Sequence, residues 1–152
     1  MPTQTIQLVI EATPDEVWRA VTDAAVTPAY YFGFTARYDQ LEPGASYSYT
    51  VGDAPVITGR LREVVPGSKL SMTFAGTWAD DVAELPESVV TYEFGESAMR
   101  VPGLTHLTLT HEGLPDTDAA RNVERGWVLI LSSLKTLLET GHALVPAPAP
   151  AQ

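Results

Sequence analysis

The sequence predicts an α+β domain in which a curved antiparallel sheet of about six or seven strands packs against one long C-terminal helix. Each strand candidate alternates apolar and polar residues, so the sheet has one apolar face and one hydrated face. Turn signals recur about every eight to twelve residues, a spacing typical of an antiparallel meander. Residues 116–141 carry an apolar stripe at helical spacing, and only this segment is long enough to cover the apolar face.

Length, composition and charge limit the class of protein. The chain has 152 residues, 45% of them hydrophobic, which fits a single domain with a substantial core. Nine basic residues against 19 acidic ones give a formal net charge of −10. Such a surface repels phosphate backbones and anionic lipid headgroups, so we expect neither nucleic acid nor membrane as a partner. The absence of cysteine excludes disulfides and thiolate chemistry.

The sequence gives no sign of a membrane span or a secretion signal. No apolar run approaches the roughly 20 residues needed to cross a bilayer. The first residues lack both a basic leader and an apolar core, so a cytoplasmic location is expected. We expect residues 1–144 to form the domain and residues 145–152, which alternate Ala and Pro, to form a flexible tail.

The N-terminal part is predicted to contain one strand and two helices. Residues 5–11 alternate as a half-buried strand, with Ile6, Leu8 and Ile10 on one face. Thr13-Pro14-Asp15-Glu16 follows, with the cap, the first-turn proline and the acidic residue of a capping box, so a helix should run to about residue 23. Thr27-Pro28 repeats the cap and proline, predicting a short helix over residues 28–31.

Six further strands with period two follow. Residues Leu70, Met72 and Phe74 share one face of their strand, and Leu107, Leu109 and His111 share one face of the last strand. The acidic segment 80–87 is expected to be a long mobile loop. The predicted strands are residues 34–38, 47–51, 55–65, 69–76, 89–94 and 105–112.

The long helix has recognisable ends and one unusual residue. Asp116, Thr117 or Asp118 can cap its start, and Gly141 lies where a left-handed residue would end it. Gly126 lies inside the helix, where glycine costs about 1 kcal/mol relative to alanine. Such a glycine indicates a close approach, a kink or space left for another group. The apolar stripe consists of Val123, Trp127, Ile130, Leu131, Leu134, Leu137 and Leu138.

Four stretches of sequence resemble a known superfamily. They are IEATPDEVWRAVTD (10–23), GRLREVVP (59–66), LTLTHEG (107–113) and GWVLILSSLKTLLETG (126–141). Together with the order of elements (β-α-α-β6-α), they resemble the helix-grip fold of the START-like, or SRPBCC, superfamily. Within it, the chain is most similar to the family of the activator of the heat-shock-protein ATPase. Tyr30-Tyr31-Phe32 stands where that family usually has a tryptophan.

The resemblance implies a cavity between the sheet and the C-terminal helix, with its mouth near the short helices. Members of the superfamily include lipid carriers, hormone-binding proteins and polyketide aromatases or cyclases. The fold therefore does not specify the ligand.

The sequence offers little for metal or nucleophilic chemistry. His106 and His111 lie on opposite strand faces, and His142 lies beyond the helix, so they form no set of metal ligands. No serine lies in a G-x-S-x-G elbow, and no phosphate-binding glycine loop is present. We expect neither a metal nor a cofactor.

Two residues are weak candidates for proton transfer. His111 lies on the inward face of its strand, as a polar anchor or acid/base at the cavity rim, or as a core histidine satisfied by a backbone carbonyl. Glu63 follows the apolar register of its strand and would be a buried carboxylate if that register continues. Alternatively, a bulge turns Glu63 to solvent and Val64 and Val65 take the core positions.

The inward face is rich in aromatic residues with polar tips, which suit a pocket for a ring-bearing or acyl ligand. Ordinary core packing is the alternative for each of them. The aromatic run at residues 30–34 could form a lid, a mouth, a dimer contact or an anchor for the short helix. The candidate ligand-binding residues are Tyr31, Phe34, Tyr38, Tyr47, Tyr49, Leu61, Met72, Phe74, Tyr92, Phe94, Leu109, His111, Trp127, Ile130, Leu131 and Leu134.

Three functional hypotheses follow. The first is a carrier, sensor or accessory protein that holds a small hydrophobic ligand, of aromatic or lipid-like character, between the sheet and the helix. The second is a cyclase or aromatase that uses the same cavity, with His111, Glu63 or a tyrosine moving protons. The third is an interaction domain that stimulates a chaperone ATPase. The candidate partners are a small ligand, a second copy of the chain and a chaperone.

Overall fold

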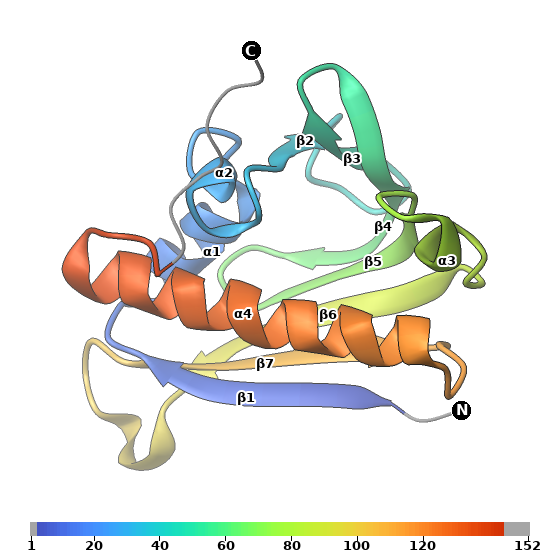
Figure 1. Ribbon diagram of the computed structural model, residues 1–152. Coiled ribbons are helices and arrows are strands. Elements are labelled where there is room, and N and C mark those ends of the chain that lie inside the picture. Colours follow the sequence, from blue (N-terminus) through green and yellow to red (C-terminus); the bar gives the residue numbers. More distant parts are fainter. Residues whose placement is uncertain (1–2, 145–152) are drawn as a thin grey trace.

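The computed structural model describes residues 3–144, and the predicted flexible tail at 145–152 lies outside the described residues. A seven-stranded antiparallel sheet curves around the helix α4 (Asp118–Thr140) (Figure 1). This is the α+β helix-grip arrangement that the sequence predicted. The other elements are β1 (Gln4–Ile10), α1 (Pro14–Thr22), α2 (Thr27–Tyr30), β2 (Thr35–Tyr38), β3 (Ser46–Val51), β4 (Ala54–Val65), β5 (Lys69–Gly76), α3 (Asp80–Ala83), β6 (Ser88–Glu96), η1 (Ala98–Arg100) and β7 (Thr105–Glu112).

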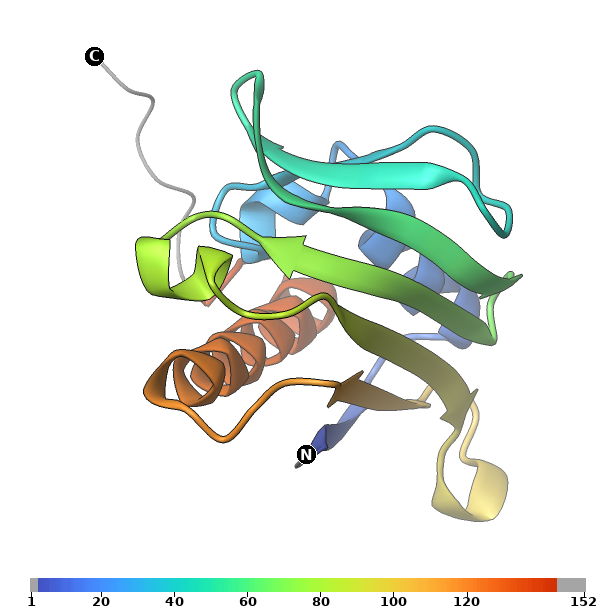
Figure 2. The same ribbon diagram turned by 90° about the vertical axis from the view of Figure 1, so that its right-hand side faces the viewer.

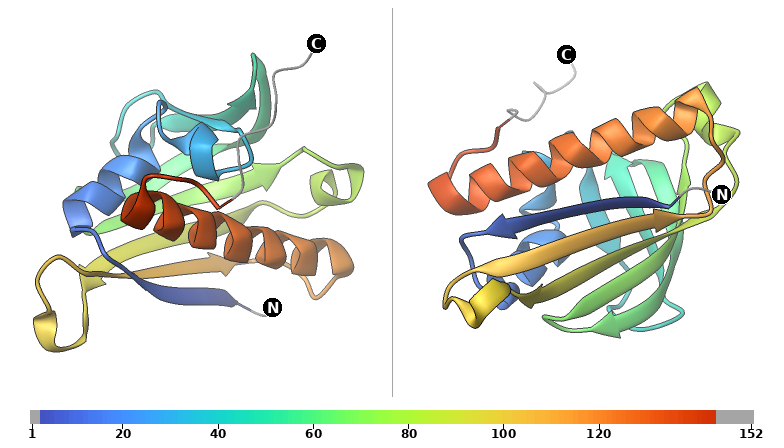
Figure 3. Two further views of the ribbon diagram at one scale, coloured as in Figure 1. Left: turned by 60° about the vertical axis from the view of Figure 1, so that its left-hand side comes forward. Right: turned by 90° about the horizontal axis from the view of Figure 1, so that it is seen from below.

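The strand order β1-β7-β6-β5-β4-β3-β2 pairs the first strand with the last. Consecutive strands from β2 to β7 are neighbours, as expected for a meander. Figure 2 looks roughly along α4 and shows the strands arching around it, and Figure 3 shows the same curvature from below. Helices α1 and α2 lie near the C-terminal end of α4, and α3 lies near its start (Figure 1). Among residues 3–144, no helix combines the length and hydropathy required to cross a bilayer.

The predicted alternation of faces is confirmed in the central strands. In β7, Leu107, Leu109 and His111 are fully buried, while Thr108 and Thr110 between them are only half-buried. Strand β5 likewise buries Leu70, Met72 and Phe74. The buried face packs against α4, whose Val123, Trp127, Ile130, Leu131 and Leu134 are all buried.

Two irregularities in β4 help to curve the sheet. The pairing with β3 shifts between Tyr49 and Thr50, and the pairing with β5 shifts between Leu61 and Glu63. Each shift leaves one extra residue on β4, and such bulges bend a strand and increase its twist. β4 is the longest strand, with 12 residues, and its bends help the sheet to wrap around the helix rather than lie flat beside it.

Helix α1 begins as predicted, whereas α2 does not. Thr13 and Glu16 form a reciprocal capping box, with N–O distances of 3.2 and 3.0 Å. The expectation that Thr27 caps the second helix is wrong. Thr27 lies inside α2, and its hydroxyl accepts a hydrogen bond from the backbone amide of Ala36 (2.9 Å). This side chain therefore ties α2 to β2.

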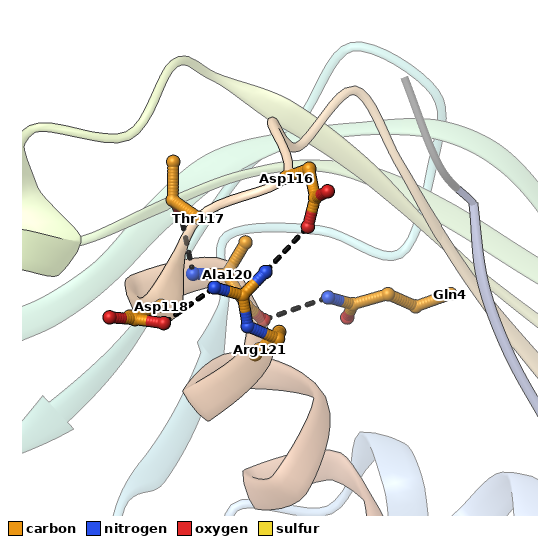
Figure 4. Close-up of polar contacts among 6 residues, drawn as sticks. All are labelled: Gln4, Asp116, Thr117, Asp118, Ala120 and Arg121. Carbon is orange, nitrogen blue, oxygen red and sulfur yellow. Dashed lines mark hydrogen bonds and ion pairs between the residues drawn. The ribbon is translucent and has the colours of Figure 1, made fainter.

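Helix α4 has well-defined ends. The hydroxyl of Thr117 accepts a hydrogen bond from the amide of Ala120, and Gly141 ends the helix in a left-handed conformation. Asp116 and Asp118, the alternative caps, instead pair with Arg121 (Figure 4).

Side chains of α4 cover the outer edge of β1. Lys135 donates a hydrogen bond to the carbonyl oxygen of Val9 (2.7 Å), and Glu139 accepts one from the amide of Glu11 (2.8 Å). Near the other end of the strand, Gln4 donates to the carbonyl oxygen of Ala120 (Figure 4). Strand β1 is therefore fixed both to β7 and to the helix.

The segment 80–87, predicted as a mobile loop, contains the helical turn α3. Val82 is only 5% exposed and anchors this turn in the core. The acidic residues around Val82 hid this buried position from the sequence pattern. This turn lies beside the start of α4.

Candidate ligand-binding site

A cavity of about 350 Å³ lies between α4, the segment that follows α2, and the sheet. Its wall is overwhelmingly apolar, and six of its eleven residues are aromatic. Ligand sites are typically apolar hollows of about 300–1,000 Å³ with a few polar groups, so this cavity is at the small end of that range. The wall consists of Tyr31, Phe32, Phe34, Ile57, Phe74, Trp78, Asn122, Val123, Gly126, Trp127 and Ile130.

Gly126 leaves space on the helix side of the cavity. A β-carbon added there would meet no atom of another segment nearer than Cε2 of Phe32, at 3.8 Å. The glycine is therefore not required by a close approach of backbone, one of the explanations that the sequence had left open. Its missing side chain instead enlarges the cavity.

Phe32 faces Gly126 from the segment after α2. Its backbone is left-handed (φ 54°), a conformation that costs a residue with a side chain about 1–2 kcal/mol. Its side chain is nevertheless 41% exposed, so burial of the ring does not fully account for the conformation. Strain of this kind is characteristic of functional segments, and Phe32 lines the mouth of the cavity.

Trp78 forms another part of the wall, in the loop after β5. Its ring lies where the side chain of residue 76 would be, since a β-carbon on Gly76 would lie 2.4 Å from Cζ3 of Trp78. The ring also contacts Phe74 edge-on, with centroids 6.1 Å apart. Trp78 remains 40% exposed and therefore lies partly at the surface.

His111 lies behind the cavity wall and fixes Trp127. The indole N–H of Trp127 donates to Nδ1 of His111 (2.9 Å), and Nε2 of His111 lies 2.7 Å from Oγ of Ser88. Because an indole can only donate, Nδ1 accepts and Nε2 carries the proton. Burial lowers the pKa of His111 to about 4, so the imidazole is neutral near pH 7.

This arrangement differs in part from both interpretations of His111. The residue is on the predicted face, but its partners are side chains rather than a backbone carbonyl. Trp127 and Phe74 line the cavity, whereas His111 does not. His111 therefore positions the tryptophan ring rather than meeting the contents of the cavity.

Glu63 lies in solvent. The bulge after Leu61 reverses the register, so the carboxylate points outward and pairs with Lys69 at 3.3 Å. Val64 packs against the core as the alternative interpretation expected, but Val65 is exposed. Of the two orientations that the sequence left open for Glu63, the outward one is confirmed and the inward one is wrong, because a residue inserted into a strand shifts every later side chain to the other face.

Most of the tyrosines belong to a packed cluster beside the cavity. Tyr31 lies against Tyr49 with ring centroids 4.5 Å apart, and the hydroxyls of Tyr38 and Tyr49 are 3.2 Å apart. Tyr47 donates to the carbonyl oxygen of Thr73 (2.5 Å). Burial raises the pKa of Tyr38 to about 12 and that of Tyr31 well above its ordinary value, so these hydroxyls stay protonated and uncharged.

Five of the candidate ligand-binding residues line the cavity, namely Tyr31, Phe34, Phe74, Trp127 and Ile130. The remaining candidates lie in or beside the surrounding core. They are Tyr38, Tyr47, Tyr49, Leu61, Met72, Tyr92, Phe94, Leu109, His111, Leu131 and Leu134.

Several wall residues carried no ligand-binding prediction. Ile57 shares the inward register of Gly59 and Leu61, so extending that alternation would have found it. Trp78 and Asn122 gave weaker signals, since one is a lone tryptophan in a loop and the other a polar residue on an amphipathic helix. Val123 completes this group. Phe32 and Gly126, also in the wall, had been considered as part of a mouth and as space for another group. Within residues 3–144, no three His, Asp or Glu side chains converge as metal ligands would.

The curved sheet, the long helix and the hollow between them define a helix-grip domain of the START-like class. The sequence profile of the family described as Activator of Hsp90 ATPase homolog 1-like protein matches residues 11–139. The chain belongs to this family. Comparison with curated proteins found no match.

Solved structures share the fold across nearly the whole chain. A Mesorhizobium loti protein superposes with a TM-score of 0.75 and 21% identity, covering 91% of this chain and 97% of its own. An HSP90 activator from Plasmodium falciparum gives 0.73 and 22%, with 90% and 96% covered. The Aha1 dimer from Colwellia psychrerythraea gives 0.70 and 17%, with 93% and 98% covered.

Proposed function

We propose that the protein binds a small hydrophobic ligand in the cavity between the sheet and α4, as a carrier, sensor or accessory protein. The observation that supports this most strongly is the apolar hollow beside Gly126. A helix optimised only for stability would have alanine or a larger residue there, because glycine lowers helix stability by about 1 kcal/mol. Retaining glycine keeps the hollow open.

Thermal unfolding with apolar ligands tests this proposal. A ligand that binds only the folded state at about 100 times its Kd stabilises the protein by about 2.7 kcal/mol. For a domain of this size, that corresponds to a rise in Tm of roughly 5–10 °C. Trp78 and Trp127 both line the cavity, so quenching of tryptophan fluorescence should accompany the shift.

The variant Gly126→Leu should abolish both signals. The leucine side chain projects into the hollow, while leucine favours the helix more than glycine does. Val128→Leu is the matched control, because it enlarges an exposed residue two positions further along the same helix. A ligand-induced shift that persists in Gly126→Leu and equals that of the control would rule out binding in this cavity.

Family membership favours a second function, the stimulation of an Hsp90-type chaperone ATPase. A structural relative is described as an HSP90 activator. The ATPase rate of a purified chaperone of this class from the same cells should rise when the protein is added at stoichiometric concentration. An unchanged rate over a wide range of protein concentrations would end this proposal without affecting the first.

The cyclase hypothesis receives less support from the described residues. Its two proton-transfer candidates are outside the cavity wall, since Glu63 is in solvent and His111 lies behind Trp127. The one tyrosine in the wall, Tyr31, has a pKa raised well above its ordinary value by burial and would be a weak acid.

A further inference from the structure

We propose that the cavity selects uncharged, planar ligands of one or two fused rings, and that any polar substituent lies at the mouth beside Asn122. This inference rests on the proposed binding function and adds the chemical class of the ligand. It follows from the size of the cavity, the charge of its wall and the arrangement of its rings.

Volume limits the ligand to about two rings. A dry protein cavity of about 150 Å³ can hold benzene. The present cavity, at about 350 Å³, is roughly twice that size. A bicyclic ring system fills this space, whereas a larger polycyclic molecule exceeds it.

Charge excludes anions from the interior. The eleven wall residues include no acidic, basic or histidine side chain, so a ligand carboxylate would be buried without a counter-ion. The indole N–H of Trp127 is already donated to His111 and cannot serve a ligand without breaking that bond. The chain as a whole carries a net charge of −10, which further disfavours an anion.

The rings of the wall suit a flat, rigid guest. Tyr31 and Trp127 are nearly perpendicular, at 84° with centroids 5.7 Å apart, and Phe74 meets Trp127 at 51°. A planar ring can therefore stack on one of these side chains and meet another edge-on. A flexible acyl chain gains no such geometry and loses more conformational freedom on binding.

The polar groups of the wall are neutral and few. Asn122 is exposed, and its amide can both donate and accept a hydrogen bond. Tyr31 adds a hydroxyl that burial keeps protonated. A neutral ligand hydroxyl, carbonyl or amide can form a hydrogen bond with Asn122 at the mouth or with the buried Tyr31.

Three probes separate the ligand classes by calorimetric titration of the full chain at pH 7. They are 2-naphthol, which is planar and neutral, 2-naphthoate, which has the same rings with a negative charge, and decanoate, an anionic acyl chain. We expect 2-naphthol to bind, and each anion to bind at least roughly tenfold more weakly, because the wall offers no cationic side chain to its carboxylate and the protein carries a net charge of −10.

A charge introduced at the mouth provides a gain-of-function test. Asn122→Arg should strengthen binding of 2-naphthoate by roughly tenfold, since the guanidinium can pair with a carboxylate, and should not strengthen binding of 2-naphthol. Val128→Arg, which adds the same charge on the exposed side of α4, should change neither affinity. If both variants gain the same affinity for 2-naphthoate, the net charge of the protein, and not a contact at the mouth, determines this affinity.

The outcomes distinguish the two proposals. If decanoate or 2-naphthoate binds the wild-type protein as tightly as 2-naphthol and Gly126→Leu abolishes that binding, the cavity binds ligands but the inferred class is wrong. If none of the three probes binds, both proposals fail.

Discussion

Burial keeps His111 neutral in the folded protein, and each of its two ring nitrogens forms a hydrogen bond. Nδ1 accepts the indole proton of Trp127, and Nε2 donates to Ser88. Ser88 in turn donates to the carbonyl oxygen of Phe74 (3.3 Å). A second proton on the imidazole would remove the acceptor that holds Trp127, so the stability of the wall depends on pH.

Stability should fall as the pH falls from about 6.5 to about 4. Burial lowers the pKa of His111 from 6.5 to about 4, so between these values the unfolded chain binds the proton and the folded chain does not. Stability contributed by the neutral imidazole is therefore present above pH 6.5 and is lost as the pH falls. The shift corresponds to about 3 kcal/mol.

His111→Gln is the variant that isolates this effect. Its amide oxygen can accept from Trp127 and its amide nitrogen can donate to Ser88, but the side chain does not titrate. Urea unfolding at a series of pH values should show that the free energy of unfolding falls more steeply with decreasing pH in the wild-type protein than in the variant. Parallel curves would show that the carboxylates, which titrate in both proteins, account for the acid sensitivity.

The sequence predicted which residues point inward but not which of them line the cavity. Alternation assigns Phe74, Tyr92 and Leu109 to the same face without distinguishing wall from core. That distinction depends on the distances among three parts of the chain: β5, α4 and the segment that follows α2. Only the folded structure defines these distances. Trp78 has no periodic pattern around it, so the sequence does not predict its place in the wall. Its ring occupies the space that a side chain at Gly76 would fill.

At the scale of the elements, β4 passes very close to β5 at Gly59. A β-carbon at this position would lie 2.1 Å from the carbonyl oxygen of Thr73 and 2.7 Å from Cε1 of Tyr47. The hydroxyl of Tyr47 also donates to that same carbonyl oxygen. Gly59 therefore allows a tyrosine ring to cross the strand between the two bulges.

Gly59→Ala should destabilise the protein by about 2 kcal/mol or more, because backbone and a packed ring must both move. Gly95→Ala in β6 is the control. Its nearest contact would be the carbonyl oxygen of His106 at 3.6 Å, an ordinary van der Waals distance. Urea unfolding should leave the control within about 0.5 kcal/mol of the wild type. Equal losses in both variants would contradict the steric explanation.

The approximate number of strands, their meander arrangement and the sequence positions of most elements could be predicted because period-two alternation and turn residues are local signals. The positions of the bulges in β4 could not be predicted, so the sequence left both orientations of Glu63 open. A bulge depends on the pairing register of two strands and on the curvature of the sheet around α4, and the hydrophobic pattern predicts neither of them. The same limit applies to α3, whose one buried residue gives no periodicity.

At the scale of the whole molecule, the net charge of −10 opposes compaction. The described residues form only a few ion pairs, all of them at least partly exposed, such as Lys69 with Glu63 and Arg121 with Asp116. Exposed pairs of this kind contribute little stability. Repulsion among the remaining acidic groups should therefore dominate the response to salt.

The Tm should rise as NaCl increases from about 0.01 M to about 1 M, a change that shortens the Debye length from about 30 Å to about 3 Å. Screening removes repulsion that is stronger in the compact folded state than in the expanded chain. Differential scanning fluorimetry at fixed pH can measure this. A falling Tm would show that attractive pairs outweigh the excess of negative charge.

The cover on β1 has a consequence for assembly. A sheet edge is a template on which another chain can add a strand. Here Lys135 occupies the carbonyl oxygen of Val9 and Glu139 occupies the amide of Glu11, so these two backbone groups already have partners. The opposite edge, β2, is only four residues long. Addition of a strand from a second copy is therefore disfavoured at this end of β1, and β2 offers only a short template.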